Sequence, residues 1–143
     1  MENKLDISAL KKAAQAFDNA LAFAGKVEAK PADAQEFYEL ESARTAAIHH
    51  FEFTYELCWK TMKRYIEMDS GSEEADVLTR KDLFRLSAEK RLITDFHQWV
   101  KFHEARNRTT HVYNEEVADD VYEIAKKFAD PLHDFITAIE QRI

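Results

Sequence analysis

Eight consecutive residues, Arg106-Asn107-Arg108-Thr109-Thr110-His111-Val112-Tyr113, hold the side chains of this sequence that are best suited to chemistry. Arg106 offers a planar cation with several N–H donors, which suits phosphate oxygens. A histidine can act as a general acid or base near neutral pH, so His111 can move a proton. Asn107 can orient either group, and the Tyr113 phenol can act as a nucleophile. The octet therefore predicts a site that holds a phosphate and transfers a proton.

Helix geometry limits how this octet can work. Arg106 and His111 are five residues apart, so on an unbroken helix their side chains would point about 140° away from each other. They converge only if the helix ends between them. Residues 109–112 include three β-branched side chains, which disfavour helix, and Asn114 is a good N-cap for a new one. We expect His111 in a connection between two helices; the alternative is structural, with an Arg that offsets the helix dipole and a His that caps a carbonyl.

One Arg–His pair is only half of a metal-independent ribonuclease site. Cleavage of RNA needs a base for the 2′-hydroxyl, a proton donor and a group that stabilises the phosphate. Two pairs that meet in one cleft supply all three, which favours a dimer.

A long helix expected over residues 33–68 gives a second reason to predict a dimer. One apolar stripe steps along it by three and four residues, and further apolar side chains widen that stripe: Phe53, Leu57, Trp59 and Ile66. A helix that is apolar on more than one face must be covered on more than one face. A second subunit would cover it; the alternative is that Phe53 and Trp59 lie singly exposed or under a loop.

The composition predicts one all-α domain over residues 1–143. Two glycines and two prolines are far fewer turn residues than a β-rich or α/β protein of this size needs. Cys58 is the only cysteine, which fits a reducing cytoplasm and a place in the core. We expect no signal peptide and no membrane span, because the N-terminus is charged and no run of about 18 apolar residues occurs.

The amount and distribution of charge limit the kinds of partner that the chain is expected to bind. The net charge of −7 argues against broad coating of nucleic acid. Residues 79–108 carry eight Lys or Arg against four Asp or Glu, whereas residues 109–143 carry three against eight. The basic stretch could face a phosphate or an acidic partner; an ordinary solvated helix surface is the alternative.

The apolar spacing predicts an antiparallel up-and-down bundle of four to five helices. Besides residues 33–68, the expected helices are 6–27, one from an N-cap at Thr79 to residue 88, one capped by Thr94, and one after Asn114. Residues 69–74 are predicted as a loop. The last helix should continue with a kink across Pro131; a break with Asp130 as a new N-cap is the alternative.

The remaining histidines and loops predict no metal and no cofactor. No two of the six histidines stand four residues apart, and the chain has neither a Walker loop nor a dinucleotide-binding glycine pattern. His103 lies one turn before Asn107 and is a candidate to line the same cleft. His133 is expected at the surface, and Tyr55 is expected to pack in the core.

The octet resembles the signature of HEPN-domain proteins: an Arg, four residues, a His, any residue and a Tyr. The whole chain is similar to the HEPN partners of minimal nucleotidyltransferases, a group called nucleotidyltransferase substrate-binding proteins. The resemblance also rests on the all-α layout, on residues 51–60 with the sequence FEFTYELCWK, and on the stretch Asn114-Glu115-Glu116.

The resemblance implies a dimeric helical bundle with Arg106 and His111 of both subunits along a shared cleft. Relatives act as metal-independent ribonuclease toxins of toxin–antitoxin modules, which makes this pair catalytic and Asn107 supporting. The cognate nucleotidyltransferase is the antitoxin and adds AMP to the motif tyrosine, here Tyr113. RNA and the nucleotidyltransferase are thus the expected partners. The alternative is a non-catalytic subunit that presents a substrate to its nucleotidyltransferase.

Overall fold

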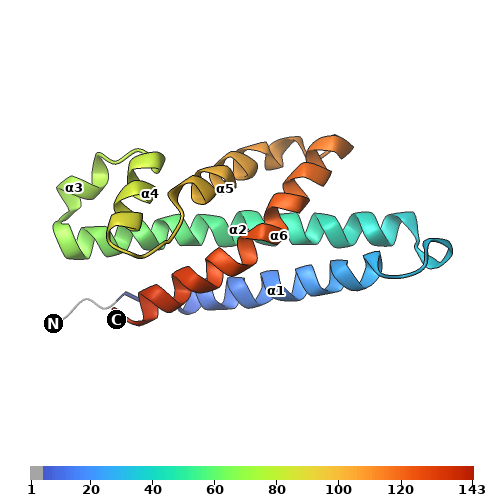
Figure 1. The fold of residues 1–143 in the computed structure, drawn as a ribbon, viewed down its shortest axis with the longest axis horizontal. Coiled ribbons are helices and arrows are strands. Elements are labelled where there is room, and N and C mark those ends of the chain that lie inside the picture. Colours follow the sequence, from blue (N-terminus) through green and yellow to red (C-terminus); the bar gives the residue numbers. More distant parts are fainter. Residues whose placement is uncertain (1–4) are drawn as a thin grey trace.

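The computed structural model describes residues 5–143, and every regular element within them is helical (Figure 1). The α-helices are α1 (Ser8–Glu28), α2 (Phe37–Ser70), α3 (Ser72–Asp76), α4 (Arg80–Glu89), α5 (Phe96–Arg108) and α6 (Glu115–Glu140). Two 3₁₀ turns are also present: η1 (Ala32–Ala34) lies between α1 and α2, and η2 (Thr109–His111) lies between α5 and α6. Five of the α-helices have ten residues or more. The predicted all-α fold with four to five helices is confirmed, and α3 is an additional short helix.

The four longest helices form the predicted antiparallel, up-and-down arrangement. Figure 1 shows α1 and α2 side by side in opposite directions, α5 running back along α2, and α6 crossing the bundle to the N-terminal end of α1. An ion pair joins the two ends, with Lys11 Nζ 3.4 Å from Glu140 Oε2. The short α3 and α4 lie at the C-terminal end of α2. Among residues 5–143, none of the helices has the length and apolar character needed to cross a bilayer.

Aromatic rings from four helices make the centre of the core. Phe128 of α6 lies edge-on to Phe17 of α1, Phe51 of α2, and both Trp99 and Phe102 of α5, with ring centroids 5.0 to 5.7 Å apart. All five side chains are buried. Burial of each such ring contributes roughly 1.5–3 kcal/mol, and edge-to-face pairs add about 0.5–1.5 kcal/mol. This cluster fixes α5 and α6 on α2, and therefore fixes the connection between them.

The boundaries of α2 differ from the prediction at both ends. It begins at Phe37, not at residue 33, because the Gln35 side chain donates to the carbonyls of Glu28 and Lys30 and holds an extended backbone before the helix. It ends at Ser70, two residues beyond the predicted end at residue 68, and Gly71 follows with a φ of 99°, which suits glycine. Residues 72–76 then form α3, not a loop, with Ala75 buried.

The caps of the later helices follow the prediction with one correction. Thr79 caps α4 by accepting from the Asp82 amide, and Asn114 caps α6. Thr94 does not cap α5; Asp95 does, by accepting from the Gln98 amide. The alternative break at Asp130 is also wrong, because α6 continues through Pro131.

Candidate functional site

The octet spans the end of α5, the turn η2 and the link to α6. Arg106 and Asn107 lie in the last turn of α5, which ends at Arg108. The Thr109 hydroxyl donates to the Arg106 carbonyl at 2.7 Å, and the Thr110 hydroxyl donates to the Asn107 carbonyl at 3.5 Å. These side chains satisfy carbonyls that a continuing helix would bond, so the predicted end of the helix between Arg106 and His111 is confirmed.

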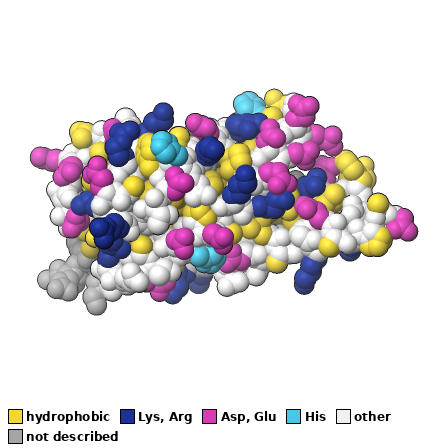
Figure 2. All heavy atoms as spheres, in the orientation of Figure 1, with side chains coloured by type: hydrophobic (Ala, Val, Ile, Leu, Met, Phe, Trp, Pro, Cys, Tyr) yellow, Lys and Arg dark blue, Asp and Glu magenta, His cyan; other side chains and the backbone are white. Residues whose placement is uncertain are grey.

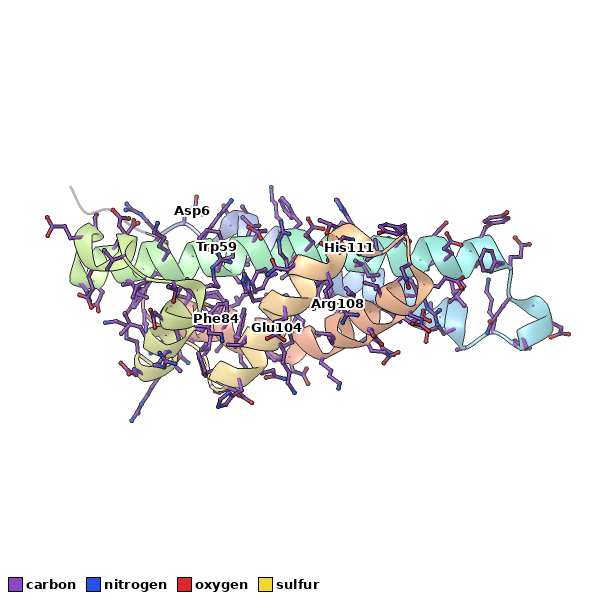
Figure 3. The ribbon with its side chains drawn as sticks, turned by 90° about the horizontal axis from the view of Figure 1, so that it is seen from above. Asp6, Trp59, Phe84, Glu104, Arg108 and His111 are labelled. Atoms are coloured by element: carbon purple, nitrogen blue, oxygen red, sulfur yellow. The ribbon has the colours of Figure 1, made fainter. Side chains whose placement is uncertain are left out.

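Asn114 fixes the other end of this connection. Its side-chain oxygen accepts from the amides of Glu116 at 2.9 Å and Val117 at 3.3 Å, and its own amide donates to the His111 carbonyl at 3.0 Å. His111 is thus held between two capped helices (Figure 3).

Arg106 turns toward α2. Its Nε donates to Glu56 Oε1 at 2.6 Å, and its Nη2 lies 3.6 Å from Glu52 Oε1. The side chain of Arg106 is 27% exposed, so the guanidinium is held at the surface but is not covered. The sequence predicted the cation but not these two partners. The only signal was their spacing of four residues, which places both carboxylates on one face of α2.

His111 and Tyr113 turn toward solvent. Both are exposed, and the Tyr113 hydroxyl lies 3.5 Å from His111 Nδ1. Tyr113 is 83% exposed, so a second macromolecule can reach its hydroxyl. Among residues 5–143, the hydrogen bonds and ion pairs link Arg106 to α2 and His111 to Tyr113, but do not link Arg106 to His111. A single chain therefore presents the two groups separately.

Asn107 touches a half-buried histidine. Its Nδ2 is 3.4 Å from His103 Nε2, and His103 Nδ1 is 2.8 Å from the Tyr55 hydroxyl. Burial lowers the pKa of His103, and the positive charge of Arg80 lowers it further, so the ring is neutral near pH 7. Burial also raises the pKa of Tyr55. His103 therefore contacts the octet through Asn107, while its place in a cleft stays a prediction. Tyr55 packs in the core, as predicted, and its hydroxyl is hydrogen-bonded to His103.

Two surface grooves flank the octet. One, of about 340 Å³, lies between α2 and the start of α6 and is lined by Tyr113 together with Phe37 and Arg44. The other, of about 600 Å³, lies along α5 and α6 and holds Arg108 and Glu104, which Figure 3 labels on α5. The second groove mixes cations and carboxylates, so it is not a dedicated phosphate surface.

The extra apolar face of α2 is largely covered within the chain, which corrects the sequence prediction. Ile66 is buried, and Leu57 and Trp59 are half-buried against the core. Trp59 lies under Arg80, whose guanidinium carbon is 3.6 Å from the ring centroid. Phe53 is 53% exposed and is the member of this set that the chain covers least.

The other sequence candidates lie where they were expected. Cys58 is buried in the core, and His133 is exposed, with Nε2 2.7 Å from Asp18 Oδ2. No group of three or more His, Cys, Asp or Glu within residues 5–143 is arranged to hold a metal ion. On the face drawn in Figure 2, acidic and basic side chains are interspersed.

A family model described as nucleotidyltransferase substrate binding protein like matches residues 5–141, almost the whole chain. A probable ribonuclease HepT of Haemophilus influenzae is 39% identical over 77 residues. That match covers 53% of this chain and 53% of that protein, so the matched part of the chain spans about half the length of its curated relative.

Two solved structures share the fold. One from Haemophilus influenzae, described as the fold of a substrate binding domain of a nucleotidyltransferase, has a TM-score of 0.82 at 24% identity. It covers 94% of this chain and 99% of its own. A second, from Thermus thermophilus, has a TM-score of 0.61 at 24% identity and covers 86% of this chain and 98% of its own. At these identities the likeness concerns the helical fold.

Proposed function

The chain belongs to the family of nucleotidyltransferase substrate-binding-like proteins, and we propose that it is a dimeric, metal-independent ribonuclease that a partner nucleotidyltransferase controls. The pair forms a toxin–antitoxin module in which this chain is the toxin. The observation that carries the proposal is the end of α5: Arg106 and His111 lie on the two sides of a helix break and near the surface, with Arg106 held against α2. The name of the Haemophilus relative supports a ribonuclease.

The residues suit cleavage through the 2′-hydroxyl of RNA. His111 of one protomer takes the proton of the 2′-hydroxyl, and the 2′-oxygen bonds to the adjacent phosphorus. The bond from phosphorus to the 5′-oxygen breaks, and the partner protomer's imidazole, in its protonated form, gives that oxygen a proton. The products are a 2′,3′-cyclic phosphate and a 5′-hydroxyl. Arg106 stabilises the charge that grows on the phosphate oxygens, with Asn107 beside it.

Modification of Tyr113 offers a physical means of control. Its hydroxyl attacks the α-phosphate of ATP, pyrophosphate leaves, and the phenol proton passes to solvent. Because Tyr113 Oη is 3.5 Å from His111 Nδ1, the added phosphodiester places a negative charge and a nucleotide beside the proposed base. RNA phosphate is then repelled and physically excluded from the site.

A non-catalytic subunit that docks the nucleotidyltransferase is the second candidate. The observation that favours it is the acidic surroundings of Arg106, since Glu52 and Glu56 both face its guanidinium in a chain of net charge −7. In that case Arg106 holds α5 on α2 and contributes no chemistry.

Cleavage of RNA in EDTA by the purified protein separates the two candidates. We expect the wild type to leave cyclic phosphate ends, and we expect His111→Ala and Arg106→Ala each to lower kcat by about a hundredfold or more. His133→Ala is the matched control, because His133 is also exposed and hydrogen-bonded to a neighbour. Intact RNA with wild-type protein, or equal cleavage by His111→Ala, would favour the non-catalytic subunit.

Tyr113→Phe tests the modification separately. Incubation with the partner nucleotidyltransferase and ATP should add AMP mass to the wild type and none to Tyr113→Phe. Tyr38→Phe is a close control, because Tyr38 is 79% exposed and Tyr113 is 83% exposed. Mass spectrometry of tryptic peptides locates the adduct; equal labelling of Tyr113→Phe would show that another residue is the acceptor.

A further inference from the structure

Arg106 has two acidic partners that hold it in different ways. Glu52 and Glu56 stand one turn apart on α2 and face α5. The Glu56 contact is a short, charge-assisted hydrogen bond of 2.6 Å to Nε. The Glu52 contact is 3.6 Å to Nη2, which is beyond hydrogen-bonding distance.

Glu56 is itself held in place. Its second carboxylate oxygen accepts from Trp59 Nε1 at 2.9 Å, so both oxygens have a donor. The Trp59 ring is in turn covered by the Arg80 guanidinium. Burial alone would raise the pKa of Glu56, but hydrogen bonds from Arg106 and Trp59 outweigh it and hold that pKa below its ordinary value. Glu56 is therefore a fixed, ionised anchor.

A chain of contacts leads from this anchor back to the octet. Arg80 Nη1 donates to the Tyr55 hydroxyl at 3.3 Å, and that hydroxyl is 2.8 Å from His103. His103 then contacts Asn107, the neighbour of Arg106. The series of contacts leaves the octet at Arg106 and returns to it at Asn107. It joins α2, α4 and α5, which gives it the rigidity that positioning requires.

Glu52 has no such support. Its side chain is 37% exposed against 27% for Glu56, and within residues 5–143 it makes no hydrogen bond. Its charge lies on the Nη side of Arg106, whereas Glu56 takes the Nε position. A phosphate that binds Arg106 must use the Nη groups, because Nε–H is already committed.

We propose that Glu56 is a positioning residue, which fixes Arg106 through Nε so that its Nη groups face the RNA phosphate, and that Glu52 is a displaceable competitor for that phosphate. This inference rests on the proposed ribonuclease function. It predicts that neutralising Glu56 slows cleavage, whereas neutralising Glu52 tightens the binding of RNA. If both glutamates only formed structural ion pairs, replacing either one would lower activity. If both only repelled RNA, replacing either one would tighten the binding of RNA.

Steady-state cleavage of RNA by variants of the dimeric protein tests these two opposite effects. Glu56→Gln should lower kcat by about tenfold or more, because a misplaced cation stabilises the transition state poorly. Glu52→Gln should lower KM by up to about fivefold and leave kcat within about twofold, because one exposed competing charge is removed. Glu67→Gln is the matched control: Glu67 also pairs with an arginine, Arg64, and lies about 16 Å along α2 from Glu56.

A second measurement reports on Arg106 without turnover. In ¹H–¹⁵N spectra the Arg106 Nε–H signal, assigned by its loss in Arg106→Lys, should exchange slowly with water in the wild type. The exchange rate of this proton should be higher in Glu56→Gln and unchanged in Glu52→Gln. Addition of a non-cleavable 2′-O-methyl oligoribonucleotide should shift the Nη signals at lower concentration in Glu52→Gln than in the wild type.

The outcomes separate this inference from the function it rests on. If the wild type does not cleave RNA, the proposed function fails, and the inference falls with it unless the oligoribonucleotide shifts the Arg106 Nη signals as described. If the wild type cleaves RNA but both glutamine variants change kcat and KM in the same direction, the function stands and the positioning role is wrong. An unchanged Nε–H signal in Glu56→Gln also overturns it.

Discussion

At the scale of single residues, His103 makes stability depend on pH. Burial and the charge of Arg80 lower its pKa in the folded protein, while the nearby carboxylates of Glu56 and Glu104 oppose that shift only in part. In the unfolded chain its pKa returns to about 6.5. Below that pH the unfolded state binds a proton that the folded state does not, so the free energy of unfolding falls as the pH drops from about 6.5 through the lower, folded pKa.

Urea unfolding of wild type and His103→Gln across pH 5 to 8 measures this effect. Because glutamine does not titrate, we expect the stability of the wild type relative to His103→Gln to decrease toward pH 5 and to level off above neutral pH. His133→Gln, at an exposed histidine, provides the comparison. A constant difference between wild type and His103→Gln over the whole range would contradict the prediction.

At the scale of helices, Asn114 begins α6 and also closes the turn that holds His111. Asn114→Ala removes the acceptor for two amides of the first turn, so the free energy of unfolding should fall by about 1 kcal/mol. Asn114→Asp keeps an acceptor and should restore most of that loss. Denaturant unfolding of the three proteins measures both changes. If Asn114→Ala were as stable as the wild type, the cap would contribute nothing to the free energy of unfolding.

Local signals of this kind were readable from the sequence. The caps Thr79 and Asn114 depend only on a side chain and the amides two or three residues after it, and the end of α5 depends on neighbouring β-branched residues. Thr94 failed as a cap because the adjacent Asp95 is an equally good acceptor one residue nearer the helix. The start of α2 failed because Gln35 bonds carbonyls at the end of α1, a contact between elements.

Contacts between distant residues were not readable in the same way. Arg106 and Glu56 are fifty residues apart, and nothing in either local sequence says which face of α5 meets α2. That register is set by the ring cluster around Phe128, where four helices meet. The octet could therefore be located from the sequence, whereas the carboxylates that hold its arginine required the packed structure.

At the scale of the whole molecule, the proposed site is incomplete in one protomer. Arg106 faces α2 and His111 faces solvent, while Phe53 is exposed on α2. If two protomers share one cleft, the arginine and the histidine that act on one phosphate need not come from the same chain.

A mixing experiment tests this sharing directly. A dimer that combines one wild-type chain with one His111→Ala chain keeps a single His111 imidazole, so it lacks either the base or the acid and should be nearly inactive. When wild type and His111→Ala are co-refolded at equal concentration, random assortment makes about half of the dimers mixed and leaves about a quarter with two His111 side chains. We expect the mixture to cleave RNA at about a quarter of the rate of the wild type at the same total concentration. If each protomer used only its own pair, the mixture would keep about half of that rate.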